Sequence, residues 1–335
     1  MTSRIARLIA AAALMAGSAV AGQALAFGDK EVARQTAFGG SCVKCELSGR
    51  NLAGARIVGA NFSGAALVGA NLQEARFHAS NFVGADLSRA DLSDAGMSGA
   101  NFQGANLSSA KLRASEAQGV MFGGANLSRA DLSDINATGA NFSKAMMSNA
   151  VLRAGDFRGG QFDGADLTRA ILNDIDGTAA QFRWTKLQGA SLRSADLRTS
   201  NFSKADAREA NFTDADLTGA MLGWGRFERA SFRSADLGSA NLTGASFDGA
   251  DFRDADLRRA MIAGADFSGA RGLTQDQVDE ACGDSRTKLP GGLVAKNCHG
   301  MRVIVKTPRP PAPPAPPAPP ETPRYFVSLH DEPAR

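Results

Sequence analysis

The sequence has few of the residue types on which most enzyme sites are built. Its 335 residues include one tyrosine, two tryptophans, three histidines and four cysteines, whereas glycine occurs 37 times. The histidines, His78, His299 and His330, are too scattered to predict a catalytic triad, and neither a glycine-rich phosphate loop nor a metal-ligand spacing occurs. We therefore expect a protein that is not an enzyme and that uses no cofactor or metal.

An excess of charge of one sign is also missing. The net charge is +3, which predicts neither a nucleic-acid partner nor an acidic surface that imitates nucleic acid. Apart from Leu8–Val20, no apolar run approaches the length of a membrane span.

That single apolar run has the features of an export signal. It follows Arg4 and Arg7 and precedes Ala24-Leu25-Ala26, which fits a small-x-small cleavage site. The pattern predicts a signal peptide over residues 1–26, and an uncleaved membrane anchor is the alternative. We expect the mature chain, from Phe27, to have no membrane span and to be periplasmic or secreted.

What the sequence contains instead is a period of five residues. From Leu47 to Phe267 the register holds through 45 consecutive pentads, and the central residue is Leu, Phe, Met or Ile in 41 of them. The residue two before the centre is Ala in 33 pentads, and the residue directly before it is Asn or Asp in 25. Neither the helical period of 3.6 nor the strand period of 2 explains this pattern. It predicts a chain that turns a corner every five residues, with both apolar positions pointing inward and the Asn or Asp bonded to backbone at the corner.

A second period, of 20 residues, gives the number of corners in one coil. Phenylalanine recurs at this spacing from Phe62 to Phe202, and leucine recurs from Leu52 to Leu192. Four pentads per coil predict a square parallel solenoid with coils ~4.8 Å apart, the distance between hydrogen-bonded strands. At that spacing the pentads make about 11 coils and a rod about 54 Å long.

The pentads resemble the pentapeptide-repeat family, whose unit reads A(D/N)LXX, over residues 45–270. The resemblance implies an all-β solenoid of the right-handed quadrilateral parallel β-helix type, and the handedness comes from the resemblance alone. Some members of the family resemble duplex DNA in shape and charge and protect DNA gyrase, which gives an alternative function. That function needs an acidic rod, whereas residues 46–270 hold 23 Lys and Arg against 25 Asp and Glu.

Irregular pentads test whether two positions point inward. Where the centre shrinks to Ala137 or Gly177, the alanine position grows to Ile135 or Ile175, as a close-packed interior requires. Ser115 and Ala117 show no such exchange, so we expect a small void or local irregularity there.

The ladder of phenylalanines ends at Phe202. Phenylalanine then recurs at other positions, namely 212, 232 and 252, and 227, 247 and 267. We interpret residues 203–211 as a change of core, with a bend or a shift in coil phase.

The two open ends of a solenoid need caps. We assign residues 27–44 to an N-terminal cap and residues 271–300 to a C-terminal cap that contains a short helix. For this helix the pattern predicts Thr274 as N-cap, a capping box with Gln277, a contact between Leu273 and Val278, and Gly283 as the stop.

Beyond the C-terminal cap the chain is rich in proline. Residues 301–335 are predicted to form a flexible tail with an extended polyproline segment. The tail is either a plain extension or a spacer that a partner binds, and composition does not decide between them.

The four cysteines are predicted to form two disulfides, because an exported chain with an even number of cysteines favours them. The pairs are Cys42–Cys45 and Cys282–Cys298. A redox role for the Cys42–Cys45 pair is a further alternative, although no βαβ context surrounds it. One zinc site shared by both pairs and His299 is excluded within one chain, because the rod holds the pairs far apart.

One group of surface residues departs from the repeat. Trp184, Lys204 and Trp224 take the same outward position on three successive coils, where most other members are glycine. The rings are expected about 10 Å apart with the ammonium between them, as a candidate binding surface for a protein or a cell-envelope glycan. In the alternative, each ring only covers its own corner. The sequence thus predicts an exported, non-enzymatic scaffold or binding rod of the cell envelope.

Overall fold

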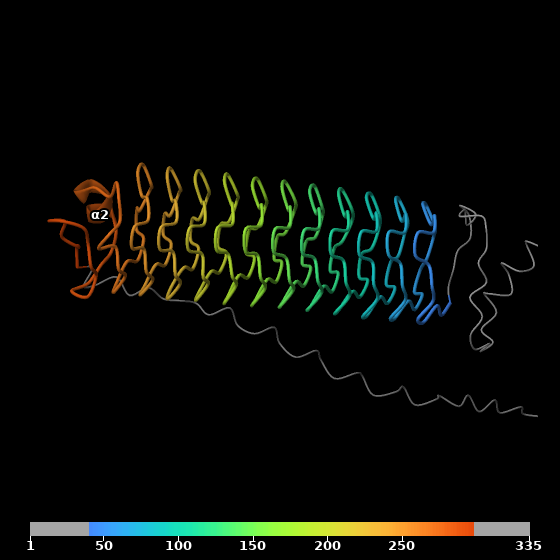
Figure 1. Ribbon diagram of the computed structural model, residues 1–335. Coiled ribbons are helices and arrows are strands. Elements are labelled where there is room, and N and C mark those ends of the chain that lie inside the picture. The colour runs from blue at the N-terminus through green and yellow to red at the C-terminus, as the bar shows by residue number, and fades with distance from the viewer. Residues whose placement is uncertain (1–39, 298–335) are drawn as a thin grey trace, which may run out of the picture. The chain divides into compact units, whose positions relative to one another are not determined.

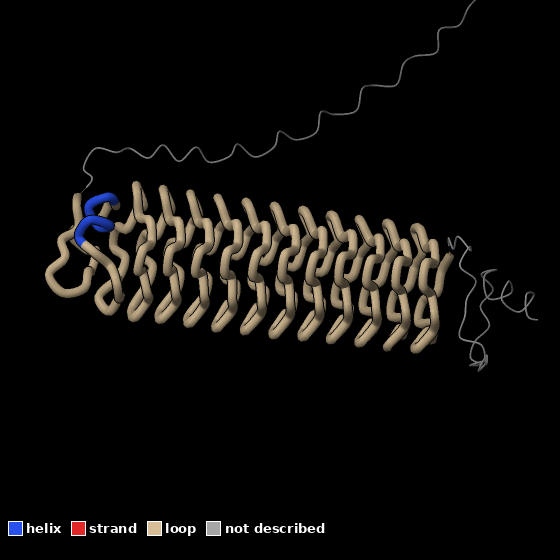
Figure 2. Tube along the Cα trace, turned by 90° about the horizontal axis from the view of Figure 1, so that it is seen from above, coloured by secondary structure: helices blue, strands red, loops and turns tan. Residues whose placement is uncertain are grey.

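The computed structural model describes residues 40–297, which lie in one compact unit. Square coils stack into a rod, and the short helix α2 closes its C-terminal end (Figure 1). On every side of a coil, one residue forms a parallel bridge to the residue twenty positions further on. These bridges run from Ser41 with Asn61 to Asp251 with Arg271. These four ladders consist of single-residue bridges, so Figure 2 draws the coils as loop. The predicted leader, residues 27–39 and residues 298–335 lie outside the described residues.

One pentad shows how the backbone is satisfied. The N–H of Phe62 donates to the carbonyl of Asn81 in the next coil (2.7 Å), and the N–H of Ala65 donates back to Phe62 (3.0 Å) and closes the corner. The N–H of Ser63 has no backbone partner and donates to Oδ1 of Asn61 (3.1 Å). The same bond recurs in pentad after pentad, so the Asn or Asp before the centre serves the corner, as predicted.

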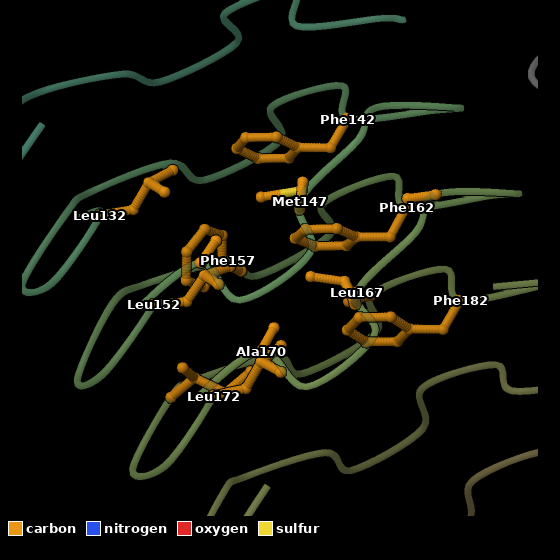
Figure 3. Packing of buried hydrophobic residues seen from close by; sticks show 14 of the residues in the cluster. Leu132, Phe142, Met147, Leu152, Phe157, Phe162, Leu167, Ala170, Leu172 and Phe182 are labelled. Atoms are coloured by element: carbon orange, nitrogen blue, oxygen red, sulfur yellow. The ribbon is translucent and has the colours of Figure 1, made fainter. Parts of the chain in front are cut away.

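The interior is filled by the central and alanine side chains, as predicted. Nearly all of them are fully buried. From Phe62 to Phe202 each phenylalanine ring stacks on the ring one coil away, with centroids 4.6–5.3 Å apart. Figure 3 shows Phe142, Phe162 and Phe182 in this stack. A continuous packed core therefore runs along the rod and leaves no lumen among these residues.

The two inward positions exchange volume, which confirms their assignment. A Cβ added to Gly177 would lie 2.9 Å from Cδ2 of Leu197 in the next coil and 3.6 Å from Cδ1 of Ile175, so the space beside Gly177 is already filled. On the same side, Phe157 occupies the space of the residue two before it: a Cβ on Gly155 would lie 2.5 Å from its ring. Ser115 does not exchange volume, but its buried hydroxyl donates to the carbonyl of Leu112 (2.7 Å).

The expected shift in coil phase at residues 203–211 is wrong. The bridges keep their spacing of twenty through this region, for example between Asp206 and Arg226. What changes is the position of the large side chains, because Leu222 succeeds Phe202 while Phe212 succeeds Leu192 in the column on the opposite side of the coil. Phe202 and Phe212 meet edge to face at 5.8 Å, so the exchange preserves both the packing and the backbone register.

The C-terminal cap is α2, Gln275–Glu280, with Thr274 as N-cap and a complete capping box to Gln277. The helix ends at the C-cap Ala281, two residues before the predicted stop, Gly283. It ends there because the next residue, Cys282, resumes the coil and donates its N–H to Ala260 (2.8 Å). Among the described residues, there is no helix with the length and apolar character to cross a membrane.

Gln277 also closes the end of the rod. Its side-chain amide donates to the carbonyls of Phe252 (3.0 Å) and Ala255 (2.8 Å). In a regular coil the carbonyl of Ala255 would accept a backbone N–H from the next coil, as that of Ala55 does from Arg76. The helix therefore supplies a side-chain donor where the ladder stops.

Regular coil geometry begins at Ser41, so residues 40–44 form a first pentad within the segment assigned to the N-terminal cap. Its centre is Cys42, which packs against the core and forms a disulfide with Cys45 across the corner, with a Cα–Cα distance of 5.2 Å. Cys282 is also disulfide-bonded, and Cys298, its predicted partner, lies outside the described residues.

The corners predict opposite effects for two matched substitutions. Ala114 and Gly104 are both exposed and both have positive φ, 54° and 64° respectively. Because a Cβ is disfavoured in this region, Ala114→Gly is expected to stabilise by about 0.5–1 kcal/mol and Gly104→Ala to destabilise by a similar amount. Urea unfolding measures both changes, and Ala110→Gly, in the buried alanine column, serves as the destabilising control. Equal signs at positions 104 and 114 would contradict the explanation.

The C-terminal cap is expected to loosen in acid. Lys288 (2.8 Å) and Ser268 hold the pKa of Asp266 at about 2, and Arg286 and the N–H of Gly264 do the same for Asp284. Since the unfolded value is ~4, these carboxylates stabilise the cap fully above pH ~4, and the contribution is lost as the pH falls towards 2. Hydrogen exchange of residues 262–290 between pH 5 and 2 should show this loss. Asp266→Asn with Asp284→Asn should flatten the dependence, and an unchanged profile would contradict it.

Candidate binding surface

The candidate residues occupy one corner column of the rod. Glycine holds seven of the twelve positions from 44 to 264, whereas Trp184, Lys204 and Trp224 follow one another on successive coils. All three have positive φ, at 56°, 61° and 59°. A side chain in this region costs roughly 1–2 kcal/mol, so the two tryptophans are placed where folding favours glycine.

Neither tryptophan recovers that cost by burial. Trp184 is 55 % exposed and Trp224 is 65 % exposed, and Met221, on the same side of the coil as Trp224, is 41 % exposed. The alternative that each ring simply covers its own corner does not account for rings that remain more than half in solvent. Exposed aromatic side chains are common in contact surfaces, so the column is the candidate binding surface of the rod.

The side chains lean along the column toward the next coil. The Lys204 ammonium lies 5.8 Å from the Trp184 ring centroid, and the Arg183 guanidinium lies 5.4 Å from it. The ring of Trp224 instead covers Gly244, where an added Cβ would lie 2.7–3.0 Å from three ring atoms. The ammonium thus contacts the ring of Trp184, and an open glycine corner accommodates the other ring.

The charges around the column are unevenly paired. Arg183 is bonded to Asp163, which raises the pKa of the guanidinium. Lys204 and its neighbour Lys186 form no ion pair with any residue from 40 to 297.

Asp206, a carboxylate on the adjoining side of the rod, is already engaged. Asp206 is held by Arg208 (2.8 Å) and Arg226 (3.7 Å), and the latter also contacts Glu228 (3.4 Å). Lys204 in the corner column and Lys186 on the adjoining side therefore have no counter-ion among residues 40–297.

An ordered charge ladder on another side was missed by the sequence reasoning. Six aspartates stack at a spacing of twenty residues: Asp156, Asp176, Asp196, Asp216, Asp236 and Asp256. Arg158 pairs with the first two and lowers the pKa of Asp156, and Arg198 pairs likewise with the next two. The sequence signal that could have revealed this ladder is the arginine two residues after three of its aspartates, at Arg158, Arg198 and Arg258. Arg258 pairs with Asp256, so three arginines offset only part of the charge of the six aspartates.

Other chemistry finds little support in the described part of the chain. Residues 40–297 contain no cluster of three or more His, Cys, Asp or Glu that could hold a metal ion. A hollow of about 500 Å³ lies between α2 and the last coil, at the C-terminal end of the rod, and Arg253, Arg258 and Gln277 are among the residues that line it. The corner column is thus an open surface on the outside of the rod.

The comparisons agree with the repeat geometry. A family model described as pentapeptide repeats matches residues 45–109 and 118–271, and the unmatched stretch contains the irregular Ser115 and Ala117. No curated protein matches the chain.

Solved structures are similar to it. HetL from Nostoc sp. strain PCC 7120, described as involved in heterocyst differentiation regulation, is 30% identical, with a TM-score of 0.54 over 57% of this chain and 88% of HetL. Rfr23 from Cyanothece 51142 is 26% identical over 30% of this chain and 63% of its own, with a TM-score of 0.25. QnrB1, described as a plasmid-mediated fluoroquinolone resistance protein, is 20% identical over 52% of this chain and 91% of its own, with a TM-score of 0.31.

The family match spans well over half of the chain and follows the same five-residue register that the bridges show. The fold is the right-handed quadrilateral β-helix of these proteins, as the sequence predicted. The chain therefore belongs to the pentapeptide-repeat family.

Proposed function

We propose that this protein is an exported, non-enzymatic binding rod of the cell envelope that contacts its partner through Trp184, Lys204 and Trp224. One observation carries the proposal: two tryptophans and a lysine replace glycine at three consecutive corners with positive φ, and both rings remain exposed. The exposed parts of the two rings make no contact that supports the fold, whereas a partner would gain a preformed aromatic surface on a rigid support.

Export is supported by the sequence of residues 1–26 and by the even number of cysteines. The test is the intact mass of the natively produced protein, alkylated without prior reduction. Loss of residues 1–26 with all four thiols blocked supports export. A retained leader with free thiols would contradict it and would favour a location facing the cytoplasm.

Binding is tested with substitutions that leave the rod intact. Trp184→Gly and Trp224→Gly install the residue that most corners of this column already carry, so the variants should fold at least as well as the parent. The double variant is expected to lose retention on isolated cell-envelope material, whereas Lys44→Gly, at a distant corner of the same column, should keep it. Equal retention of all three proteins would overturn the proposed surface.

The DNA-mimic alternative predicts inhibition of gyrase supercoiling by the mature protein. The near-neutral charge of residues 46–270 supports the binding rod instead. Supercoiling inhibition that survives Trp184→Gly with Trp224→Gly would reverse this preference.

A further inference from the structure

The corner column has the geometry of a straight track. Successive coils advance by ~4.8 Å, so Trp184, Lys204 and Trp224 mark three equally spaced points on a line parallel to the rod. A partner that uses all three points has to be extended and has to repeat at nearly the coil spacing. A chain of pyranose sugars linked through opposite ring positions advances by about one coil per sugar.

We propose that this track binds a linear polyuronate, an acidic polysaccharide, with three consecutive sugars over Trp184, Lys204 and Trp224. The inference rests on the proposed function and names the partner class of that surface. It assigns stacking to the outer two positions and charge recognition to the middle one.

The outer positions are suited to sugar faces. The C–H bonds on one face of a pyranose carry partial positive charge, and the face of an indole ring is negative. The Trp224 ring covers Gly244 with one face, and its 65 % exposure leaves the outer side accessible. The Arg183 guanidinium and the Lys204 ammonium lie over the Trp184 ring, whose 55 % exposure leaves ring surface accessible to a sugar.

The middle position selects for an acid. The Lys204 ammonium has no carboxylate partner among residues 40–297, and Lys186 adds a second unpaired charge on the adjoining side. The carboxylate of Asp206 is occupied by arginines, so the protein itself does not neutralise these lysines. A uronate carboxylate over the middle coil supplies the missing counter-ion.

Single-stranded nucleic acid is the competing polymer, since bases also stack on tryptophan and phosphates also attract lysine. Such binding relies on many basic contacts along the backbone, whereas this rod is nearly neutral and most of its arginines near the track are already paired with carboxylates. The charge pattern therefore favours a ligand with few, regularly placed anions.

Isothermal titration of the mature full-length protein tests the proposal. The ligands are galacturonate oligomers of two, three and six units, neutral cello-oligosaccharides of the same lengths, a sulfated polysaccharide and oligothymidylate. We expect the galacturonate trimer to bind much more tightly than the dimer and the neutral trimer to bind weakly. Each of Trp184→Gly and Trp224→Gly should raise the Kd by roughly tenfold.

Lys204→Gln separates charge recognition from stacking. It should weaken galacturonate binding and flatten its salt dependence while leaving the weak binding of the neutral trimer unchanged. Lys144→Gln, in the same column two coils away from Trp184, is the matched control and should leave both ligands unaffected.

The outcomes separate this inference from the function on which it rests. Equal affinity for neutral and acidic oligomers, or tighter binding of the sulfated polymer or of oligothymidylate, overturns the polyuronate. Retention on envelope material that needs both tryptophans, without any binding of galacturonate, overturns the polyuronate and leaves the binding rod standing. If the tryptophan substitutions change neither the affinity for any ligand nor the retention on envelope material, both the polyuronate and the binding rod are overturned.

Discussion

Replacing Phe162 with alanine is expected to lower the free energy of unfolding by about 3–5 kcal/mol. The ring is fully buried and stacks between Phe142 and Phe182, each at 4.8 Å, with the edge contact of Phe157 at 5.6 Å (Figure 3). The cavity cannot collapse easily, because bridges to both neighbouring coils hold the backbone on either side. Urea unfolding followed by circular dichroism measures the loss.

The matched control for this position is Phe162→Leu. Leu222 already fills the same column three coils later, so leucine is compatible with the backbone and should cost much less, about 1 kcal/mol. Because each coil contacts only its neighbours, the alanine variant should also raise hydrogen exchange most in the coils around residue 162. An alanine variant no weaker than the leucine variant would mean that the stack does not support the rod.

Adding one methyl group at Gly155 is expected to destabilise the rod by about 1–3 kcal/mol. The new Cβ of Gly155→Ala would lie 2.5 Å from Cε2 of Phe157 and 3.1 Å from Cγ2 of Ile135, both buried. Most pentads have alanine at this position and accommodate its methyl group. The loss of stability at Gly155 is therefore expected because the central residue, Phe157, is large. Urea unfolding again gives the change.

A second substitution should reverse that loss. Phe157→Leu in the Gly155→Ala background recreates the ordinary pentad of Ala195 and Leu197, forty residues further along the same side. We expect the double variant to be more stable than Gly155→Ala alone, with a favourable coupling energy of about 1–2 kcal/mol in the double-mutant cycle. Additive losses would show that the two inward positions do not share one space.

Much of the fold could be predicted because the repeat makes local and global information coincide. The periods of five and twenty specify which residues turn the corner and which residues stack, since every coil meets a copy of itself. The capping box of Thr274 and Gln277 is likewise local, and its residues lie within one turn of helix. The family resemblance added the handedness, which spacing alone does not contain.

The candidate surface was only half predictable. Counting by twenty places Trp184, Lys204 and Trp224 in one column, but it does not tell which way a side chain leans from a corner with positive φ. The ammonium contacts the ring of Trp184, and the ring of Trp224 lies on Gly244, because each side chain extends over the next coil and meets whatever that coil presents.

By itself, the sequence determined the square coil, the two inward positions, the role of Asn and Asp at the corners and the start of the capping helix. Only the tertiary structure decided that the coil phase continues past Phe202, that α2 ends at Ala281, and that Gln277 reaches the carbonyls of Phe252 and Ala255. The reason is physical. The first group depends on contacts within a pentad or between identical coils, whereas the second depends on contacts between unlike segments twenty or more residues apart, where packing and backbone hydrogen bonds override local preference.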